Sequence, residues 1–458
     1  MSAIFDNLVR DLGLSWPTLA DVSVTGQDPW VDSVYRVGEC AAAALGAQAA
    51  AVAEIWRRRG GQRQQIKVDA LDGALATFSV NYQSQHGYVI PQLEPTYPLT
   101  HLYPASDGRW FFPHGSFPKL RNGLLDVFRC TMNPGSVAAA IASNTAQHWE
   151  DVVAASGLCG AMARSFDEWL AHPQGQALAA EPLVEIIKIG DSAPEPFQPA
   201  PRPLSGLRVL DLTHVIAGPT CGKTLAEQGA TVLHITWPGH PGLPPFDVDT
   251  THGKRAALCD LTRPEDVERM RKLAAGADVF AESYRPGGIT KLGFGPEEVA
   301  ALRPGIVYLS LNCYGWTGPW RDRPGWEQLA QVATGMSVGQ GSAAVPELQP
   351  TYPNDYVTGF LAALGVLTAL LRRADEGGSY HVRVSLCRTA MWLQQQGKVV
   401  RQKPPPVIPP AAIAARQLTK PSPFGELTYL GPVVDYEQTP SYWERMTEPL
   451  GASPAVWP

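Results

Sequence analysis

One acidic residue, Asp355, stands at the start of a long apolar stretch and is the strongest candidate for covalent chemistry. It lies in the segment YPNDYVTGFLAALGVLTALLRR, which predicts a helix with this carboxyl group in its first turn. The positive end of a helix dipole favours the ionised form of a carboxylate placed there. An ionised carboxylate next to a bound nucleotide-like ligand can act as a nucleophile. The same position also suits a helix N-cap, so these residues alone leave both roles open.

A second candidate is the segment AGPTCGKT, residues 217–224, which fits a loosened phosphate-binding loop. In that interpretation Lys223 contacts phosphate, Thr224 binds magnesium, and Glu282, which follows an apolar strand, is the acidic partner. However, Pro219 stiffens the loop, and the helix before the next strand is short. An NTPase is therefore an alternative prediction, which ATP hydrolysis that is lost in Lys223→Ala would support.

The elements that carry these residues alternate between apolar strands and helices. Strands are predicted near 207–212, 231–236, 277–281 and 305–311, and helices near 219–229, 263–275 and 297–302. Continuous apolar strands alternating with helices are typical of a parallel sheet that is covered on both faces. The fold class is therefore α/β, a Rossmann-like parallel sheet accompanied by a smaller α+β domain.

Two proline-rich stretches divide the chain, because such segments are extended and semi-rigid. The first, residues 193–204, separates the N-terminal part from the large domain, residues 205–400. The N-terminal part comprises a helical and strand segment, 1–84, and a small α+β domain, 85–192. The second stretch opens residues 401–458, which we expect to be a linker followed by an arm that docks elsewhere.

Residues 45–78 resemble residues 364–393 in the order of their features. Both contain Leu-Gly, an apolar helix, basic residues, Gly-Gly, an alternating strand and a further helix. Two generic units would have the same features, but the shared order favours an internal duplication. The first copy has Arg36 or its neighbours where the second has Asp355, so we expect one active aspartate per chain.

Composition narrows the function classes. The 458 residues carry a net charge of −6 from 37 basic and 43 acidic residues, and no long basic cluster predicts a nucleic-acid partner. The seven cysteines are scattered without a C-x-x-C pair, which indicates reduced thiols and neither a disulfide framework nor a metal site. The N-terminus has no signal-peptide pattern, and the Ala-rich run 40–53 is too short to span a bilayer. We expect a soluble cytoplasmic protein with no membrane partner.

Ordered blocks between residues 204 and 395 resemble the class III CoA-transferases, the family of formyl-CoA and carnitine-CoA transferases and methylacyl-CoA racemases. The blocks include GLRVLDLTHVIAGP, HGKRAALCDL, ADVFAESYRPGG, NDYVTGFLAALGVLTALL and VRVSL. Residues 85–190 resemble the family's small domain but precede the nucleotide-binding half, so the segment order is permuted or partly duplicated. Family members form interlocked dimers, and the resemblance therefore implies a homodimer.

The resemblance implies a CoA-transferase that acts on an acyl-CoA and a carboxylic acid and holds no permanent cofactor. Asp355 would attack the acyl-CoA thioester, giving a mixed anhydride and then an aspartyl-CoA thioester, from which the acceptor acid takes CoA. Backbone N–H groups after Asn354 would stabilise the tetrahedral oxyanions.

The resemblance also implies a set of CoA contacts. By charge, Lys254 and Arg255 suit a phosphate, although a solvated strand end would carry them too. His214 is equally consistent with a hydrogen-bonded core histidine, and Tyr284 with a core aromatic residue. The implied contacts are His214, Val215, Ala217, Lys254, Arg255, Ser283, Tyr284, Lys291, Leu292, Trp326 and Glu327.

Several positions depart from the family's pattern. Trp237 stands where many members have a phosphate-binding Arg, and Pro324 replaces a Lys of some members. Trp326 and Glu327 stand where Tyr-Asp, Phe-Asp or Tyr-Glu is usual. A glycine-rich flap is not recognisable. These departures keep open a non-catalytic CoA-binding pseudoenzyme. A racemase is a weaker alternative, because Trp326 offers no proton transfer where racemases use a His.

Overall fold

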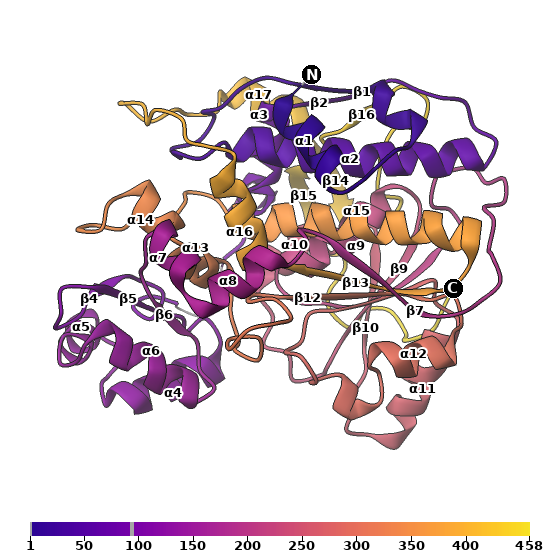
Figure 1. The fold of residues 1–458 in the computed structure, drawn as a ribbon. Helices are drawn as coiled ribbons and strands as arrows, with labels where there is room; N and C mark the ends of the chain where they lie inside the picture. The colour runs from indigo at the N-terminus through magenta and orange to yellow at the C-terminus, as the bar shows by residue number, and fades with distance from the viewer. Residues whose placement is uncertain (1, 92–95) are drawn as a thin grey trace.

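The computed structural model describes residues 2–91 and 96–458, and its centre is a seven-stranded sheet (Figure 1). The strand order is β10–β9–β8–β11–β12–β13–β7, with parallel neighbours except for β7, which is antiparallel to β13. The strands are β7 (Glu185–Gly190), β8 (Arg208–Leu212), β9 (Thr231–Thr236), β10 (Lys254–Leu258), β11 (Val279–Glu282), β12 (Val307–Asn312) and β13 (Ser379–Ser385). The predicted α/β class is confirmed.

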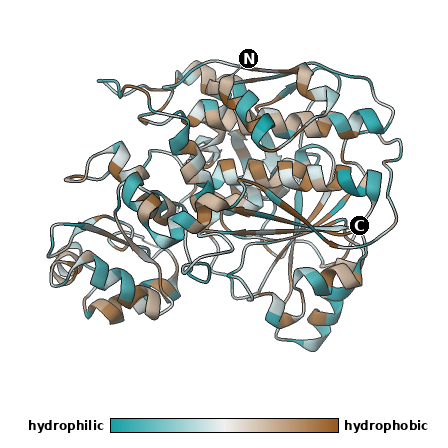
Figure 2. Ribbon diagram, viewed as in Figure 1, coloured by the Kyte–Doolittle hydropathy of each residue, from teal (hydrophilic) through white to brown (hydrophobic). Residues whose placement is uncertain are grey.

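Helices cover both faces of this sheet because successive strand residues point to opposite sides. Val209 belongs to the same buried cluster as residues of α9 (Ala217–Glu227) and α15 (Pro353–Glu376), whereas Leu210 belongs to a second cluster with residues of α11 (Pro264–Ala275) and α12 (Pro296–Leu302). The central strands are largely brown, meaning apolar, in Figure 2, in keeping with burial on both faces. By length and composition α15 would also suit a membrane span, but 94% of its apolar window is buried inside the molecule. It is therefore the central helix of the core.

The N-terminal segment repeats part of the large domain in miniature. Its elements are α1 (Ala3–Asp11), β1 (Val22–Thr25), α2 (Val37–Arg58), β2 (Ile66–Asp69) and α3 (Ala70–Ala76). The order α2–β2–α3 matches α15–β13–α16, where α16 is Leu386–Gln395. β2 lies between the parallel β1 and the antiparallel β16 (Asp435–Tyr436), as β13 lies between the parallel β12 and the antiparallel β7. This correspondence of strand directions supports the internal duplication.

The two long helices of the repeat lie side by side (Figure 1). Almost every residue of α2 between Val37 and Ile55 is buried, which its alanine-rich sequence allows, because small side chains let neighbouring elements approach on all sides. Arg36 precedes the first turn of α2 and pairs with Glu39 at 2.8 Å. Glu39 is the third residue of α2, as Asp355 is the third residue of α15, so both copies carry an acidic side chain in the first turn, and only the second copy has an aspartate there.

The small domain projects from one end of the sheet and has its own core (Figure 1). Residues 185–190 form β7 of the large sheet, so this domain ends before them and not at residue 192. Two helices, α7 (Phe166–Ala171) and α8 (Pro173–Ala180), connect the two parts. The domain contains β4 (Tyr103–Pro104), β5 (Trp110–Pro113), α4 (Pro118–Phe128), α5 (Pro134–Ile141), α6 (Ala146–Ala155) and β6 (Gly160–Met162).

The C-terminal region is more structured than the predicted linker and extended arm. It begins with α17 (Pro410–Arg416) and the hairpin of β14 (Gln417–Ser422) and β15 (Gly425–Leu430), which pairs with β3 (Ser84–Gln85). Residues 431–458, here called the arm, then cross the molecule. Besides the β16–β2 pairing, Trp443 Nε1 donates to the Lys223 carbonyl and Trp457 Nε1 to the Leu273 carbonyl, each at 3.0 Å. The arm therefore docks on both the N-terminal segment and the large domain.

Candidate active site

A cavity of about 520 Å³ lies at the carboxyl ends of the central strands. β8 and β11 are neighbours in the sheet. From β8 the strand order runs outward through β9 and β10 in one direction, and from β11 it runs through β12 in the other. Ligands of open α/β sheets bind at such a topological switch point. His214 follows β8, and Ser283 follows β11, and both line this cavity.

Hydrogen bonding and ring stacking hold these predicted contacts together. The His214 backbone N–H donates to the Ser283 hydroxyl at 3.0 Å, and the His214 ring meets Tyr284 edge-on with centroids 4.7 Å apart. His240 stacks on His214 at 5.5 Å. Burial, with a smaller effect of His240, lowers the pKa of His214 to about 3, so the imidazole is neutral at physiological pH. The structure thus brings His214, Ser283 and Tyr284 into one wall.

Positive charge gathers in this cavity, which we call the basic cavity. Lys119, Arg285 and Arg323 line it, and among the described residues around it there is no Asp or Glu. Sequence reasoning missed all three. Arg285 directly follows the predicted Ser283–Tyr284 pair, which was the available signal, whereas Lys119 comes from the small domain. Trp237, which the sequence analysis noted as a departure, also lines the cavity and is 51% exposed.

A second cavity, of about 230 Å³, contains the candidate nucleophile, and we call it the acidic cavity. Asp355 lines it together with Glu327 and with Val215 of the turn after β8, and Asp355 is 8% exposed. Phe117 and Trp326 line both cavities. Among the described residues, those that line it are Thr96, Thr100, His114, Ser116, Phe117, Val215, Ile216, Leu243, Phe246, Trp326, Glu327, Gln328, Leu348, Tyr352 and Asp355.

Aromatic side chains form the wall between the two cavities. Trp326 stacks on His114 at 5.7 Å with an interplanar angle of 15°, and its ring lies 4.9 Å from that of Phe117. Trp326 comes from the loop before α13 (Glu327–Thr334), and the other two residues come from the small domain. Trp326, which was predicted to contact the ligand, therefore forms part of a wall to which both domains contribute.

Glu327 organises the first turn of α15. Its carboxylate accepts the Asp355 backbone N–H at 2.6 Å, the Asn354 amide at 2.9 Å and the Gln331 amide at 2.7 Å. Three donors from two helices thus converge on one buried acid. The Asp355 N–H, which was expected to stabilise an oxyanion, is already bonded to Glu327.

The surroundings of Asp355 shift its pKa in the opposite direction from the one expected of a carboxylate at a helix N-terminus. Burial raises the pKa of Asp355 well above its usual range, and the charge of Glu327 raises it further. Burial also raises the pKa of Glu327, to about 7. The helix N-terminus would favour a carboxylate, but Glu327 occupies that position, and Asp355 has both low solvation and a like charge beside it.

The turn before α9 is strained and tightly packed. Val215 has a φ of +67°, a left-handed conformation that is unfavourable for a β-branched residue by roughly 1–3 kcal/mol. Such strain gathers at functional sites, and Val215 lines the acidic cavity. Gly359 of α15 allows the close approach, since a Cβ there would lie 2.6 Å from the Ala217 carbonyl oxygen. Ala217, a predicted contact, is buried in this junction.

Four predicted phosphate and adenine contacts lie outside both cavities. Lys254 is buried, and its ammonium donates to Asp211 and to the Pro219 carbonyl, each at 2.8 Å. It joins β10, β8 and α9, so its position is that of a core ion pair and not of a ligand contact. The other three, half-buried or exposed, are Arg255, Lys291 and Leu292.

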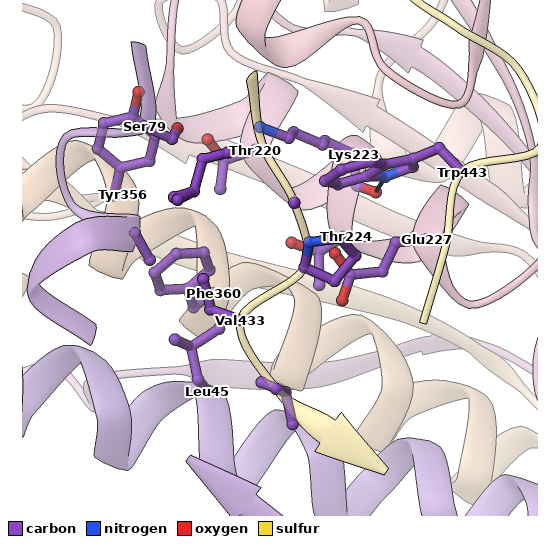
Figure 3. A pocket seen from close by; sticks show the side chains of 15 residues that line it. Leu45, Ser79, Thr220, Lys223, Thr224, Glu227, Tyr356, Phe360, Val433 and Trp443 are labelled. Atoms are coloured by element: carbon purple, nitrogen blue, oxygen red, sulfur yellow. Dashed lines mark hydrogen bonds between the residues drawn. The ribbon is translucent and has the colours of Figure 1, made fainter. Parts of the chain in front are cut away.

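The phosphate-binding-loop hypothesis is also wrong. Lys223 and Thr224 lie inside α9, not at its start, and Lys223 pairs with the buried Asp249 at 2.9 Å. Figure 3 shows Lys223 beside the Trp443 ring, at the wall of a cavity between α9, α15, α2 and the arm. This cavity, about 50 Å³, holds only a few water molecules. A nucleotide phosphate chain does not fit.

Comparison with known proteins identifies the family of this chain. Residues 204–407 match the model of CoA-transferase family III. The chain is 31% identical over 273 residues to the probable fatty acyl-CoA transferase Rv3272 of Mycobacterium tuberculosis, covering 55% of this chain and 69% of that protein. This chain belongs to CoA-transferase family III. A crystal structure of Rv3272 aligns with 43% of this chain and 57% of its own, at 34% identity and a TM-score of 0.41.

A further family relative is the acetyl-coenzyme A transferase nodX of Hypoxylon pulicicidum. It is 35% identical over 321 residues, which cover 64% of this chain and 54% of that protein. The chain therefore spans about half the length of this relative.

Proposed function

We propose that this protein transfers CoA from an acyl-CoA to a free carboxylic acid and that Asp355 is the covalent carrier. The observation that carries the proposal is the position of Asp355, whose cavity shares the Phe117–Trp326 wall with the basic cavity. CoA is a polyanion with an acyl group at the far end. Phosphates suit the cation-lined cavity, and the reacting thioester suits a position next to Asp355.

The proposed reaction proceeds in four acyl transfers. The Asp355 carboxylate attacks the thioester carbonyl, the C–S bond breaks, and a mixed anhydride and the CoA thiolate form. The thiolate attacks the aspartyl carbonyl, which releases the first acid and leaves an aspartyl-CoA thioester. The acceptor carboxylate attacks that thioester and expels the thiolate, which attacks the acceptor's acyl carbonyl and regenerates Asp355. Together, these four easier steps replace one difficult exchange.

The surrounding residues position and polarise the reacting groups. Glu327 fixes the first turn of α15 through its bonds to Asn354 and Asp355. Developing negative charge on the thioester oxygen requires fixed donors. Gln328 lines the same cavity, and because its side-chain oxygen lies 3.2 Å from His114 Nε2, its amide N–H groups are suited to that task.

Trapping of the intermediate tests the proposal. Purified protein is incubated with butyryl-CoA and other acyl-CoAs in the presence of hydroxylamine, and peptide mass spectrometry locates the hydroxamate. We expect modification at Asp355, absent from Asp355→Asn. A protein that binds CoA with neither adduct nor turnover would instead be the non-catalytic CoA-binding protein. Exchange of the acyl-CoA α-hydrogen with solvent, without an acceptor acid, would indicate the racemase.

The assembly as a homodimer is also part of this proposal, and the family's interlocked dimers support it. Sedimentation equilibrium of the purified chain tests it. A single monomeric species at micromolar concentration would contradict it.

A further inference from the structure

The two adjoining cavities carry opposite charge. The basic cavity has three cationic side chains and, among the described residues that line it, no acid. The acidic cavity has Glu327 and Asp355, and no Lys or Arg lines it in the described part of the chain. His114 adds no charge, because burial lowers its pKa to about 4.

Apart from the two acids, the lining of the acidic cavity combines apolar and uncharged polar side chains. Phe246 meets Tyr352 edge-on at 5.7 Å, and the Trp326 ring lies against that of Phe117. Leu348 is half-buried on the same lining. The uncharged polar side chains are those of Thr96, Thr100, His114, Ser116 and Gln328. They can hydrogen-bond a substrate, but no cation on the described lining can pair with a second carboxylate.

We infer that the acid exchanged at this site is a monocarboxylic acid without a second anionic group, not a dicarboxylic acid. The inference deepens the proposed function and rests on it. A second carboxylate in this cavity would lose its hydration without a cation to pair with, and would lie near the charge of the Glu327–Asp355 pair. The reacting carboxylate escapes this penalty, because its charge is consumed as the new acyl bond forms.

A comparison of two acceptors of matched length tests the inference on the wild-type protein. Butyryl-CoA is the donor, and isotopically labelled butyrate and succinate compete as acceptors, with acetate to decanoate as a length series. We expect kcat/KM for the best uncharged acid to exceed that for succinate by about 100-fold or more. Equal use of succinate would overturn the inference.

The same experiment separates failure of the inference from failure of the proposed function. Transfer to succinate with a trapped Asp355 adduct would remove only the inference. The absence of transfer to every acid, with no adduct, would remove the proposed function and the inference with it.

A cation introduced into the acidic cavity gives a second, independent test. Leu348→Arg places a guanidinium on the cavity wall, and Leu348→Met is the uncharged control of similar length. We expect the ratio of kcat/KM for succinate to that for butyrate to rise at least about tenfold in Leu348→Arg and to stay unchanged in Leu348→Met. If both folded variants keep the wild-type ratio, the charge of this wall does not set specificity, and the inference falls. The wild-type comparison stands even if the arginine variant does not fold.

Discussion

The carboxylate of Glu327 lies 2.6 Å from the backbone nitrogen of Asp355 and so takes the positive end of α15 for itself. The candidate nucleophile consequently has an acidic neighbour and no hydrogen-bond donor of its own among the bonds found in the described chain. A proton held by this pair keeps two buried acids from being charged at once. The reactive form of Asp355 therefore depends on the ionisation of the pair, which makes several properties measurable.

The first prediction concerns the pH dependence of transfer. Because the folded pKa of Asp355 is raised, kcat/KM should fall as pH decreases through that raised value, when the carboxylate becomes protonated. Glu327→Gln removes the neighbouring charge, so the midpoint of this limb should move to lower pH. The pH profile of kcat/KM measures the shift.

A matched control for that variant is Glu227→Gln. Burial raises the pKa of Glu227 to about 7, as for Glu327, but Glu227 lines the small cavity of Figure 3. Its replacement should leave the midpoint in place. If the pH profiles of kcat/KM for wild type and Glu327→Gln coincided, the charge of Glu327 would not influence the ionisation of Asp355.

The second prediction concerns recognition of the CoA phosphates. Arg285→Gln should raise KM for acyl-CoA about tenfold and leave kcat nearly unchanged, because it removes binding that ground and transition states share. The dependence of KM on salt should weaken as well. Arg321→Gln is the control, since Arg321 is exposed, pairs with Asp322 and does not line the basic cavity. If Arg285→Gln and Arg321→Gln raised KM equally, the effect would come from the overall charge of the protein and not from a phosphate contact of Arg285.

The third prediction assigns Lys254 to the core. Lys254→Met leaves Asp211 buried without its main partner and should lower the free energy of unfolding by about 3–5 kcal/mol. The double variant with Asp211→Asn should recover part of that loss. Chemical denaturation measures both. A raised KM for acyl-CoA at unchanged stability would instead support the phosphate contact expected from the family resemblance.

The Lys254–Asp211 pair also has a pH signature. Burial alone would raise the pKa of Asp211, but Lys254 and His234 hold it well below its usual range. A depressed folded pKa stabilises the protein above the unfolded value of about 4, and that stabilisation is lost as pH falls. Wild type should therefore lose stability in acid more steeply than the double variant.

The fourth prediction tests the strained turn. Val215→Gly and Val215→Ala both remove the side chain from the acidic cavity, but only glycine relieves the positive φ. The glycine variant should be more stable than the alanine variant by about 1 kcal/mol, the reverse of the order in a helix. Thermal and denaturant unfolding of the pair measures this difference. An alanine variant of equal or greater stability would argue against a left-handed residue here.

Much of the large domain could be predicted from sequence, because its strands and helices carry strong local patterns. The predicted strand near 231–236 is β9, and the helix near 263–275 matches α11 within one residue. The turn after β8 and the position of Asp355 were also recognised from local motifs. The apolar pattern of each short segment shows whether one or both of its faces are buried, so this burial can be inferred without knowing distant contacts.

The charge pattern of the site could not be read in the same way. Lys119 and Arg323 reach the basic cavity from segments about 200 residues apart, and only the folded chain shows that they converge. The direction of the Asp355 pKa depends on burial and on Glu327, which lies 28 residues earlier. The cytoplasmic location and the homodimer stay predictions from the sequence.

The arm of residues 431–458 gives the molecule one more property. It hydrogen-bonds to β2 of the N-terminal segment through β16, to α9 through Trp443 and to α11 through Trp457. A protease that cuts the exposed linker near residue 195 would consequently yield two fragments that stay together until denaturant is added. Because the arm connects the two fragments, we expect the nicked protein to elute at its native mass in gel filtration.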